Sequence, residues 1–232
     1  MTLVCKPGET VDTFLNGRLR IIQSQKGYRF SVDALLLADF AILEDEDIVV
    51  DLGAGCGIIS LLLAVQKEPG LVVGLELQND LVSQAQRNVA LNKLEQKVAI
   101  MQGDLRNPPL PPRSADIVVC NPPYRTARNG RINPDVGKAI ARHEIAVSLD
   151  AILAASATLL KRKGRLFLIY PANRMVELLT KMRRARLEPK RLQLVFPDSA
   201  SEAKLALIEG RVQARPGLKV LPPIFGQGDY SL

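Results

Sequence analysis

The segment Asp51-Leu52-Gly53-Ala54-Gly55-Cys56-Gly57 decides the fold of this 232-residue chain. The apolar run Ile48-Val49-Val50 precedes the segment and residues 58–65 follow it, so the glycines lie between a short buried strand and a helix. Glycines let the backbone approach a ligand closely, and the first turn of a helix offers free N–H groups. The segment therefore predicts a ligand-binding turn at the end of a strand.

Strand-like and helix-like runs alternate on both sides of this turn. Predicted strands cover residues 48–50, 71–75, 98–101, 117–120, 165–170, 191–196 and 203–208. Predicted helices cover residues 34–40 (with Ser31 as a cap), 58–65, 81–91 (capped by Asp80), 150–160 and 172–186. Because the strands are continuously apolar, we expect a parallel sheet with helices on both faces. The fold class is α/β, doubly wound, with a mostly parallel sheet of seven strands.

A β-hairpin is predicted ahead of this sheet. Two strand-like runs, residues 12–15 and 18–23, flank Asn16-Gly17, a pair that tolerates the positive φ of a two-residue turn. We therefore divide the chain into an N-terminal hairpin extension, residues 1–30, and one larger domain, residues 31–232.

The composition excludes several classes of protein. Hydrophobic residues make up 47% of the chain, too many for a disordered protein. No apolar run approaches the roughly 20 residues that span a membrane, and the first ten residues lack the apolar core of a signal peptide. Three cysteines without a C-x-x-C pair, together with a single histidine, predict a cytoplasmic protein without a disulfide framework or a metal site.

Positive charge is concentrated in the C-terminal third. The net charge is +7, and from residue 161 onward 15 Lys and Arg stand against 6 Asp and Glu. Such a surface favours a polyanionic partner, of which nucleic acid is the commonest. Arg183 and Arg184, on the basic helix 172–186, are the candidate phosphate contacts there.

The glycine spacing selects among nucleotide-type ligands. A dinucleotide site needs G-x-G-x-x-G, which would require glycine at position 58, where this chain has Ile58. The pattern D-x-G-x-G-x-G instead resembles the glycine loop of class I S-adenosylmethionine methyltransferases. That resemblance implies S-adenosylmethionine as cofactor, held by Asp51, Gly53, Gly55 and Gly57.

Two further acids lie at the ends of successive predicted strands. Glu76 follows the strand 71–75, about 20 residues after the glycine loop, where an acid can accept both ribose hydroxyls. Asp104 follows the strand 98–101 and could accept from the adenine amine of the cofactor. In a doubly wound sheet these ends share one ligand-binding edge, so we expect both acids at the cofactor site.

The tetrapeptide Asn121-Pro122-Pro123-Tyr124 follows the strand 117–120 and predicts the reaction. It resembles the motif of methyltransferases that modify an amine of adenine, of guanine or of a glutamine side chain. A conjugated amine is a poor nucleophile, so it needs acceptors that orient its lone pair toward the methyl group. The Asn121 side-chain oxygen, beside the cofactor, and the Pro122 carbonyl can serve, in a segment made rigid by its prolines. Tyr124 offers a flat face for stacking, and Pro123 lies beside it.

The resemblance extends over nearly the whole chain. The hairpin, Arg29-Phe30-Ser31-Val32-Asp33, the glycine loop, the tetrapeptide and Ala141-Arg142-His143-Glu144 resemble the bacterial tRNA methyltransferases that modify adenine beside the anticodon of a valine tRNA. By this resemblance Phe30, Ser31 and Asp33 border the methionine end of the cofactor, and the substrate is tRNA. The polar stretch 125–138, which matches no predicted element, contributes Arg125, Arg128 and Arg131 as candidate substrate contacts.

Other functions compete with this interpretation. Methylation of a glutamine amide in a protein uses the same tetrapeptide, although its enzymes carry an additional helical N-terminal domain. An amine in rRNA or in DNA is also a candidate, since nothing in the sequence selects ribose over deoxyribose. Ile58 argues against an NAD-linked oxidoreductase, and the intact motifs argue against a non-catalytic partner protein. The sequence gives no indication of oligomeric state.

Overall fold

A computed structural model of the chain describes residues 5–25, 32–122 and 148–226. Two sheets are present in this part. A two-stranded sheet consists of β1 and β2, and a nine-stranded sheet has the order β10-β8-β9-β7-β6-β3-β4-β5, with β11 also paired to β8.

The large sheet extends in both directions from β3 (Ile48–Leu52). On one side β4 (Leu71–Glu76) and β5 (Val98–Gln102) follow, and on the other side β6 (Ala115–Cys120) and β7 (Leu160–Pro171). All pairings among these five strands are parallel. The strand order reverses beside β3, which is where doubly wound sheets bind ligands at the carboxyl ends of their strands. The predicted doubly wound, mostly parallel sheet is confirmed.

The C-terminal strands close one side of the sheet. The strand β9 (Leu205–Val212) runs antiparallel to β7 and to β8 (Leu187–Phe196), which completes the seven predicted strands. Two short strands that were not predicted, β10 (Lys219–Val220) and β11 (Ile224–Phe225), pair parallel with β8. A strand of two residues is too short to show an alternating pattern in the sequence.

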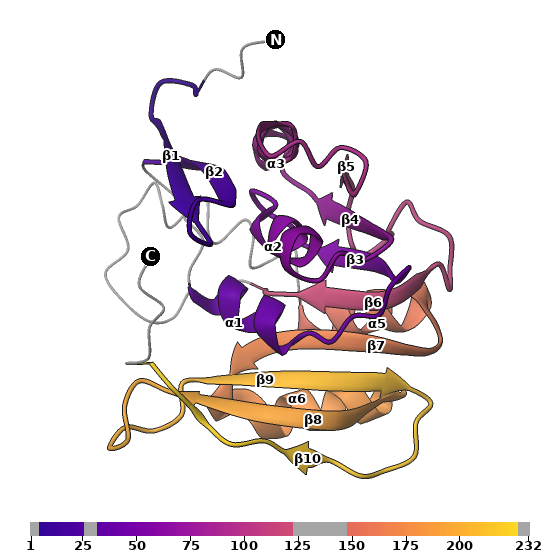
Figure 1. The fold of residues 1–232 in the computed structure, drawn as a ribbon. Helices are drawn as coiled ribbons and strands as arrows, with labels where there is room; N and C mark the ends of the chain where they lie inside the picture. The colour runs from indigo at the N-terminus through magenta and orange to yellow at the C-terminus, as the bar shows by residue number, and fades with distance from the viewer. Residues whose placement is uncertain (1–4, 26–31, 123–147, 227–232) are drawn as a thin grey trace.

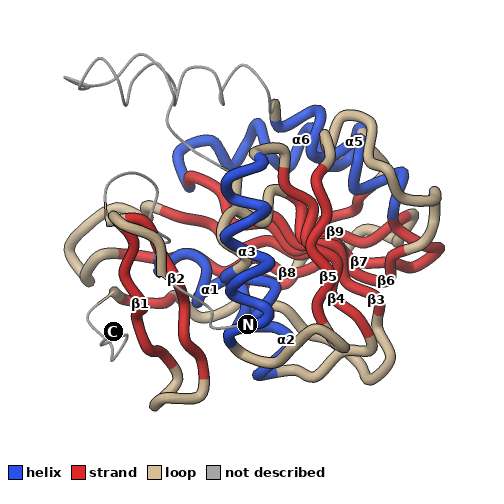
Figure 2. Tube along the Cα trace, turned by 90° about the horizontal axis from the view of Figure 1, so that it is seen from above, coloured by secondary structure: helices blue, strands red, loops and turns tan. Residues whose placement is uncertain are grey.

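Helices cover both faces of the large sheet (Figure 1). On one face lie the β1-β2 hairpin and the helices α1 (Val32–Phe40), α2 (Ile58–Gln66) and α3 (Asn79–Leu91). On the other face lie α5 (Leu149–Leu159) and α6 (Met175–Arg184). Seen from above, the strands form a layer between these two groups of helices (Figure 2). Each face has its own cluster of buried apolar side chains, so the core has two layers.

Two helix starts differ from the prediction. The helix α3 begins at Asn79 after Gln78, and Asp80 lies in its first turn and makes no capping bond. The Glu76 carboxylate accepts from the N–H of Gln78, the residue that precedes the helix. The predicted helix 172–186 begins as a 3₁₀ turn, η1 (Ala172–Arg174), and continues as α6.

The hairpin is confirmed, but its turn is longer than predicted. The strands β1 (Glu9–Phe14) and β2 (Leu19–Ser24) pair as far as Phe14 and Leu19, which leaves a four-residue loop. Three successive residues of this loop have positive φ: Leu15 at 51°, Asn16 at 54° and Gly17 at 88°. A two-residue turn at Asn16-Gly17 is therefore wrong, because Leu15 also adopts the left-handed conformation.

Two asparagines, one in α3 and one directly after its last residue, replace a partner strand along the outer edge of β2. The Asn88 side chain accepts from the Ile22 N–H (2.6 Å) and donates to the Ile22 carbonyl (3.1 Å). The Asn92 side chain does the same for Arg20, at 2.9 and 2.7 Å. One helical turn rises about 5.4 Å, close to the spacing of alternate residues in a strand. The two carboxamides thus satisfy an edge that would otherwise be unpaired.

A buried carboxylate anchors α1 to the antiparallel strands. Glu209 of β9 is fully buried, and its two oxygens accept from Arg191 (3.2 Å) and Arg211 (2.6 Å). The Arg191 guanidinium also lies 4.5 Å from the centre of the Phe40 ring and donates to the Phe40 carbonyl at the end of α1. Arg191 therefore belongs to the structural core of this region.

Glu209→Gln should destabilise the protein by about 1–3 kcal/mol, because it weakens hydrogen bonds to two charged groups at a buried site. Urea unfolding followed by circular dichroism measures the change. Glu202→Gln, at an exposed position, is the matched control and should stay within about 0.5 kcal/mol of the parent. Equal stabilities for the two variants would contradict this account of Glu209.

Candidate active site at the carboxyl edge of the sheet

The register of the parallel strands brings the predicted site residues to one edge. Leu52 pairs with Cys120 on one side and with Leu75 on the other, and Glu76 pairs with Gln102. The residues that follow these strands therefore lie side by side, about 4.8 Å apart from strand to strand. The glycine loop follows β3, and the turn that leads into α3 follows β4. The turn with Asp104 follows β5, and the Asn121-Pro122 segment follows β6.

The glycine loop needs its glycines for conformational reasons. Gly53, Gly55 and Gly57 have φ of 76°, 58° and 85°, in the left-handed region that other residues adopt at a cost. A Cβ on Gly57 would lie 3.2 Å from the Ala85 Cβ, so α3 packs closely against the loop. The N–H groups of Gly53 and Ala54 both donate to the Leu75 carbonyl, at 2.9 and 3.1 Å. The loop is thus fixed against the end of β4.

Glu76 is positioned as a rigid acceptor. One carboxylate oxygen accepts from the Gly55 N–H and the other from the Gln78 N–H, both at 2.9 Å. The residue is 7% exposed, so little of its surface reaches solvent. Among the described residues each oxygen keeps a further acceptor site, since a carboxylate can accept about four hydrogen bonds. This arrangement fits the predicted contact with a pair of ribose hydroxyls.

Asp51 supports the loop from inside the protein. Its side chain is fully buried, and Oδ2 accepts from the Ser60 N–H (3.1 Å) and from the Ser60 hydroxyl (2.7 Å) in the first turn of α2. Oδ1 has no hydrogen-bond partner among the described residues. Burial is the main cause that raises the pKa of Asp51 to about 7. The predicted cofactor residue therefore acts by holding α2 and the loop, because it has no exposed surface with which to touch a ligand.

Asp104 lies after β5, as predicted, but it has a cationic partner. Arg106 donates to both of its oxygens through Nε, at 3.0 and 2.8 Å, and these hydrogen bonds hold the pKa of Asp104 below its usual value. Its contact with the cofactor adenine stays a prediction. Leu77, which the sequence reasoning missed, is 41% exposed directly after Glu76 and offers an apolar surface at the same edge. An exposed leucine next to a buried acid is visible only once the fold is known.

Asn121 and Pro122 follow β6 next to the glycine loop. Asn121 is half-buried and Pro122 is buried. Asp33 lies in the first turn of α1 and is half-buried. The remaining predicted residues of this site lie outside the described residues: Phe30, Ser31, Pro123, Tyr124, Arg125, Arg128, Arg131 and His143.

The basic residues of α6 lie at the opposite edge of the sheet. The helix begins just after β7 ends at the carboxyl edge, and it runs back to the point where β8 begins, beside Arg211 and Arg165. Arg183 and Arg184 occupy this far end, and both are exposed, with Arg183 paired to Glu188 at 3.2 Å. The seven residues of β7 from Arg165 to Pro171 span roughly 20 Å. These two arginines therefore do not lie beside Asn121, and their contact with phosphates stays a prediction.

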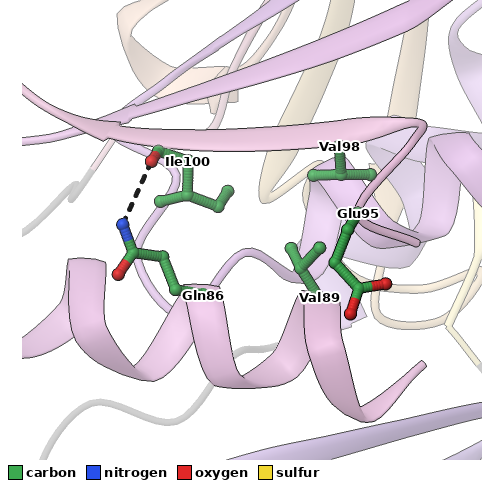
Figure 3. Close-up of a pocket in the computed structure, with 5 residues that line it drawn as sticks. All are labelled: Gln86, Val89, Glu95, Val98 and Ile100. Carbon is green, nitrogen blue, oxygen red and sulfur yellow. Dashed lines mark hydrogen bonds between the residues drawn. The ribbon is translucent and has the colours of Figure 1, made fainter. Parts of the chain in front are cut away.

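A small cavity of about 190 Å³ lies away from these residues, between α3 and β5. Figure 3 shows its lining, in which Gln86 donates to the Ile100 carbonyl at 3.3 Å. The other lining residues are Val89, Glu95 and Val98. Its volume is below the 300–1,000 Å³ usual for small-molecule sites, and none of its residues belongs to the predicted site.

Other kinds of chemistry find no support in the described part of the chain. Burial raises the pKa of Cys56 to about 11 and also raises the pKa of Cys120, so neither thiol is poised as a nucleophile. No group of three His, Cys, Asp or Glu side chains that could hold a metal ion occurs there. No helix among these residues is long and apolar enough to cross a membrane.

The doubly wound sheet, the positive-φ glycine loop and the acid at the next strand end together define a class I methyltransferase. Comparison with known proteins agrees. Residues 31–186 match the family described as the methyltransferase small domain, and the chain belongs to this family. The enzyme is therefore a methyltransferase that uses S-adenosylmethionine, and the contact of Glu76 with the ribose of that cofactor stays a prediction.

Relatives and solved structures make the comparison more specific. The chain is 30% identical over 183 residues to the tRNA1(Val) (adenine(37)-N6)-methyltransferase of Parabacteroides distasonis, covering 78% of this chain and 76% of the relative. It is 28% identical to the protein of the same name from Tolumonas auensis, covering 77% and 78%. The crystal structure of M. jannaschii TYW2 in complex with AdoMet has the same fold, with a TM-score of 0.61 at 17% identity over 89% of this chain and 86% of that chain.

The raised pKa of Asp51 predicts a pH-dependent stability. In the folded protein Asp51 keeps its proton up to about pH 7, whereas in the unfolded chain it ionises near pH 4. Its stabilising contribution is complete below pH 4 and is lost as the pH rises toward 7. Asp51→Asn mimics the protonated form, so the stability of the parent relative to this variant should fall by on the order of 3 kcal/mol between pH 5 and pH 8.

Urea unfolding of both proteins across that pH range measures the difference, and all other titrating groups cancel in the comparison. A constant difference from pH 5 to pH 8 would show that Asp51 is already ionised at pH 5 in the folded protein, so that its pKa is not raised.

Proposed function

We propose that the protein transfers the methyl group of S-adenosylmethionine to the exocyclic N6 amine of an adenine in tRNA, beside the anticodon. The observation that carries the proposal is the position of Asn121-Pro122. The segment follows β6, whose last residue pairs with the last residue of β3, so it starts next to the glycine loop. The names of the curated relatives support the same substrate. A tRNA substrate also agrees with the cytoplasmic location that the cysteine content predicts.

The proposed role of this segment is to orient a weak nucleophile. The lone pair of an adenine amine is delocalised into the ring, so the amine attacks only when its N–H groups are held and its lone pair faces the methyl group. In this proposal the Asn121 side-chain oxygen and the Pro122 carbonyl accept those two N–H groups. The buried ring of Pro122 limits the movement of the segment. Tyr124 would stack on the adenine after it leaves its neighbours.

No dedicated base is needed for this transfer. Nitrogen gains a bond to the methyl carbon as the bond from that carbon to sulfur breaks, and the positive charge moves from sulfur to nitrogen. The methylated amine is then strongly acidic and loses a proton to water. His143 is therefore not required as a base, and catalysis would rest on position and electrostatics.

Incubation with labelled S-adenosylmethionine tests the proposal directly. Separate reactions with tRNA, rRNA, DNA and total protein, followed by nucleoside or peptide analysis, identify the acceptor. N6-methyladenosine in the tRNA digest is expected. Label in a glutamine amide, in rRNA or in DNA would replace the proposed substrate with one of the competing candidates.

Asn121→Ala should lower kcat roughly a hundredfold or more, as for other preorganised hydrogen-bond partners in active sites. Because the side chain is proposed to hold the target amine, the affinity for S-adenosylhomocysteine should change little. Single-turnover kinetics and calorimetry measure the two quantities. Asn92→Ala, at the far end of α3, is the matched control and should keep the parent rate. A near-normal rate for the Asn121 variant would contradict the role given to this segment.

The candidate RNA contacts divide into two groups in this proposal. Arg125, Arg128 and Arg131 would act near the target base, and Arg183 and Arg184 would bind phosphates farther away. Because the two edges of the sheet lie roughly 20 Å apart, only a large substrate such as a folded tRNA can contact both.

Reversal of charge at Arg183 and Arg184 should weaken tRNA binding and reduce its dependence on salt. Each neutralised phosphate contributes about 0.7–0.9 to the slope of log affinity against log salt, so the double variant should lose about 1.5 from that slope. Filter binding at several salt concentrations measures it. The control is Lys93→Glu with Lys97→Glu, an equal charge change at the β5 side of the sheet. Identical slopes for both double variants would remove Arg183 and Arg184 from the RNA interface.

A further inference from the structure

We infer that the N-terminal hairpin is a functional part of the cofactor site, and that Asn88 is the positioning residue that couples the hairpin to Glu76. The inference concerns cofactor binding and does not depend on which molecule is methylated. It rests on a continuous chain of hydrogen bonds through the glycine loop.

The chain passes through two peptide groups. Glu76 accepts from the Gly55 N–H at 2.9 Å. The carbonyl of that same peptide group, from Ala54, accepts from the Gly57 N–H at 2.8 Å. The peptide group that carries this Gly57 N–H also contains the Cys56 carbonyl. That carbonyl accepts from the Asn88 side chain at 2.9 Å. Each peptide group is thus held at both ends, and the last partner in the row is Asn88.

Asn88 continues the chain into the hairpin. Its Oδ1 accepts from the Ile22 N–H (2.6 Å), and its Nδ2 also donates to the Ile22 carbonyl (3.1 Å). The side chain is fully buried, and both protons of its amide are used. If Asn88 lost its bonds to β2 or its bond to the loop, a buried polar group would be left without a hydrogen bond.

This geometry makes loop order depend on the hairpin. Ala85 packs against Gly57 at the same place, so the loop is confined between α3 and β4. A loop that the hairpin already orders does not have to be ordered by the cofactor, which lowers the entropic cost of binding. Coupling of this kind is reciprocal, so bound cofactor must also stabilise the docked hairpin.

Asn92 provides an internal control. It binds β2 through Arg20 in the same way as Asn88 binds Ile22, but its side chain has no bond to the glycine loop. A role limited to holding the hairpin would give both asparagines the same effect on the cofactor. The proposed coupling gives Asn88 the larger effect, because its side chain binds both β2 and the glycine loop.

A double-mutant cycle with S-adenosylhomocysteine as ligand tests the coupling by calorimetry, at a temperature where every variant is folded. Asn88→Ala should raise Kd about tenfold in the parent, within the usual range for coupled sites, and less than about twofold in a Glu76→Ala background. Asn92→Ala loosens the hairpin but leaves the row of hydrogen bonds to Glu76 intact, so it should raise Kd less than about twofold in either background. An equal change from Asn88→Ala in both backgrounds, or no change in either, would overturn the inference.

Hydrogen exchange on the unaltered protein gives a second test that does not require the Asn88 variant to fold. Addition of S-adenosylhomocysteine should slow exchange in Glu9–Phe14 and Leu19–Ser24 as well as in the glycine loop. The distant strands Lys219–Val220 and Ile224–Phe225 should not respond. Slower exchange in the loop with an unchanged hairpin would overturn the coupling.

Discussion

Strand β3 pairs with β4 on one side and with β6 on the other, and this double pairing determines how the described residues of the candidate site lie relative to one another. It places the end of β3 between the acid that follows β4 and the Asn121 segment that follows β6. The intervening loop can stay so close to both only because three of its residues are glycines with positive φ. The catalytic edge is therefore a consequence of strand order, because each of its described side chains lies at or just after the end of a strand.

The same topology places the catalytic edge and the exposed basic residues of α6 at opposite edges of the sheet. The described catalytic edge carries Glu76 and Asp104, and Arg106 already pairs with the second of these acids. The exposed arginines at the end of α6 lie at the other edge, because a helix that follows a parallel strand must run back across the sheet. A substrate that uses both edges must extend far beyond its reacting base. The basic C-terminal third therefore indicates a large partner, and it gives little information about the group that is methylated.

The parts of the fold that repeat regularly could be predicted from the sequence. Continuous apolar strands and the glycine loop indicated the sheet, and Glu76 lay at the expected strand end because its spacing from the loop is set by one helix and one strand. Single-residue geometry could not be read in this way. The left-handed Leu15, the first turn of α3 and the burial of Asp51 depend on neighbours distant in the sequence. The distance of Arg183 and Arg184 from the catalytic edge could not be predicted either, because charge does not reveal the direction of a helix.

The most consequential contact was also invisible in the sequence. Asn88 and Asn92 are spaced by one helical turn, a pattern usually typical of an exposed polar stripe. Their function depends on β2, in which the backbone groups of alternate residues are spaced nearly as far apart as the two asparagines. A helix can thereby complete the edge of a strand, and Asn88, deeper in the protein, also reaches the Cys56 carbonyl. An extension that precedes the methyltransferase fold is thus joined to its cofactor loop by hydrogen bonds, which gives the hairpin a reason to be part of the enzyme.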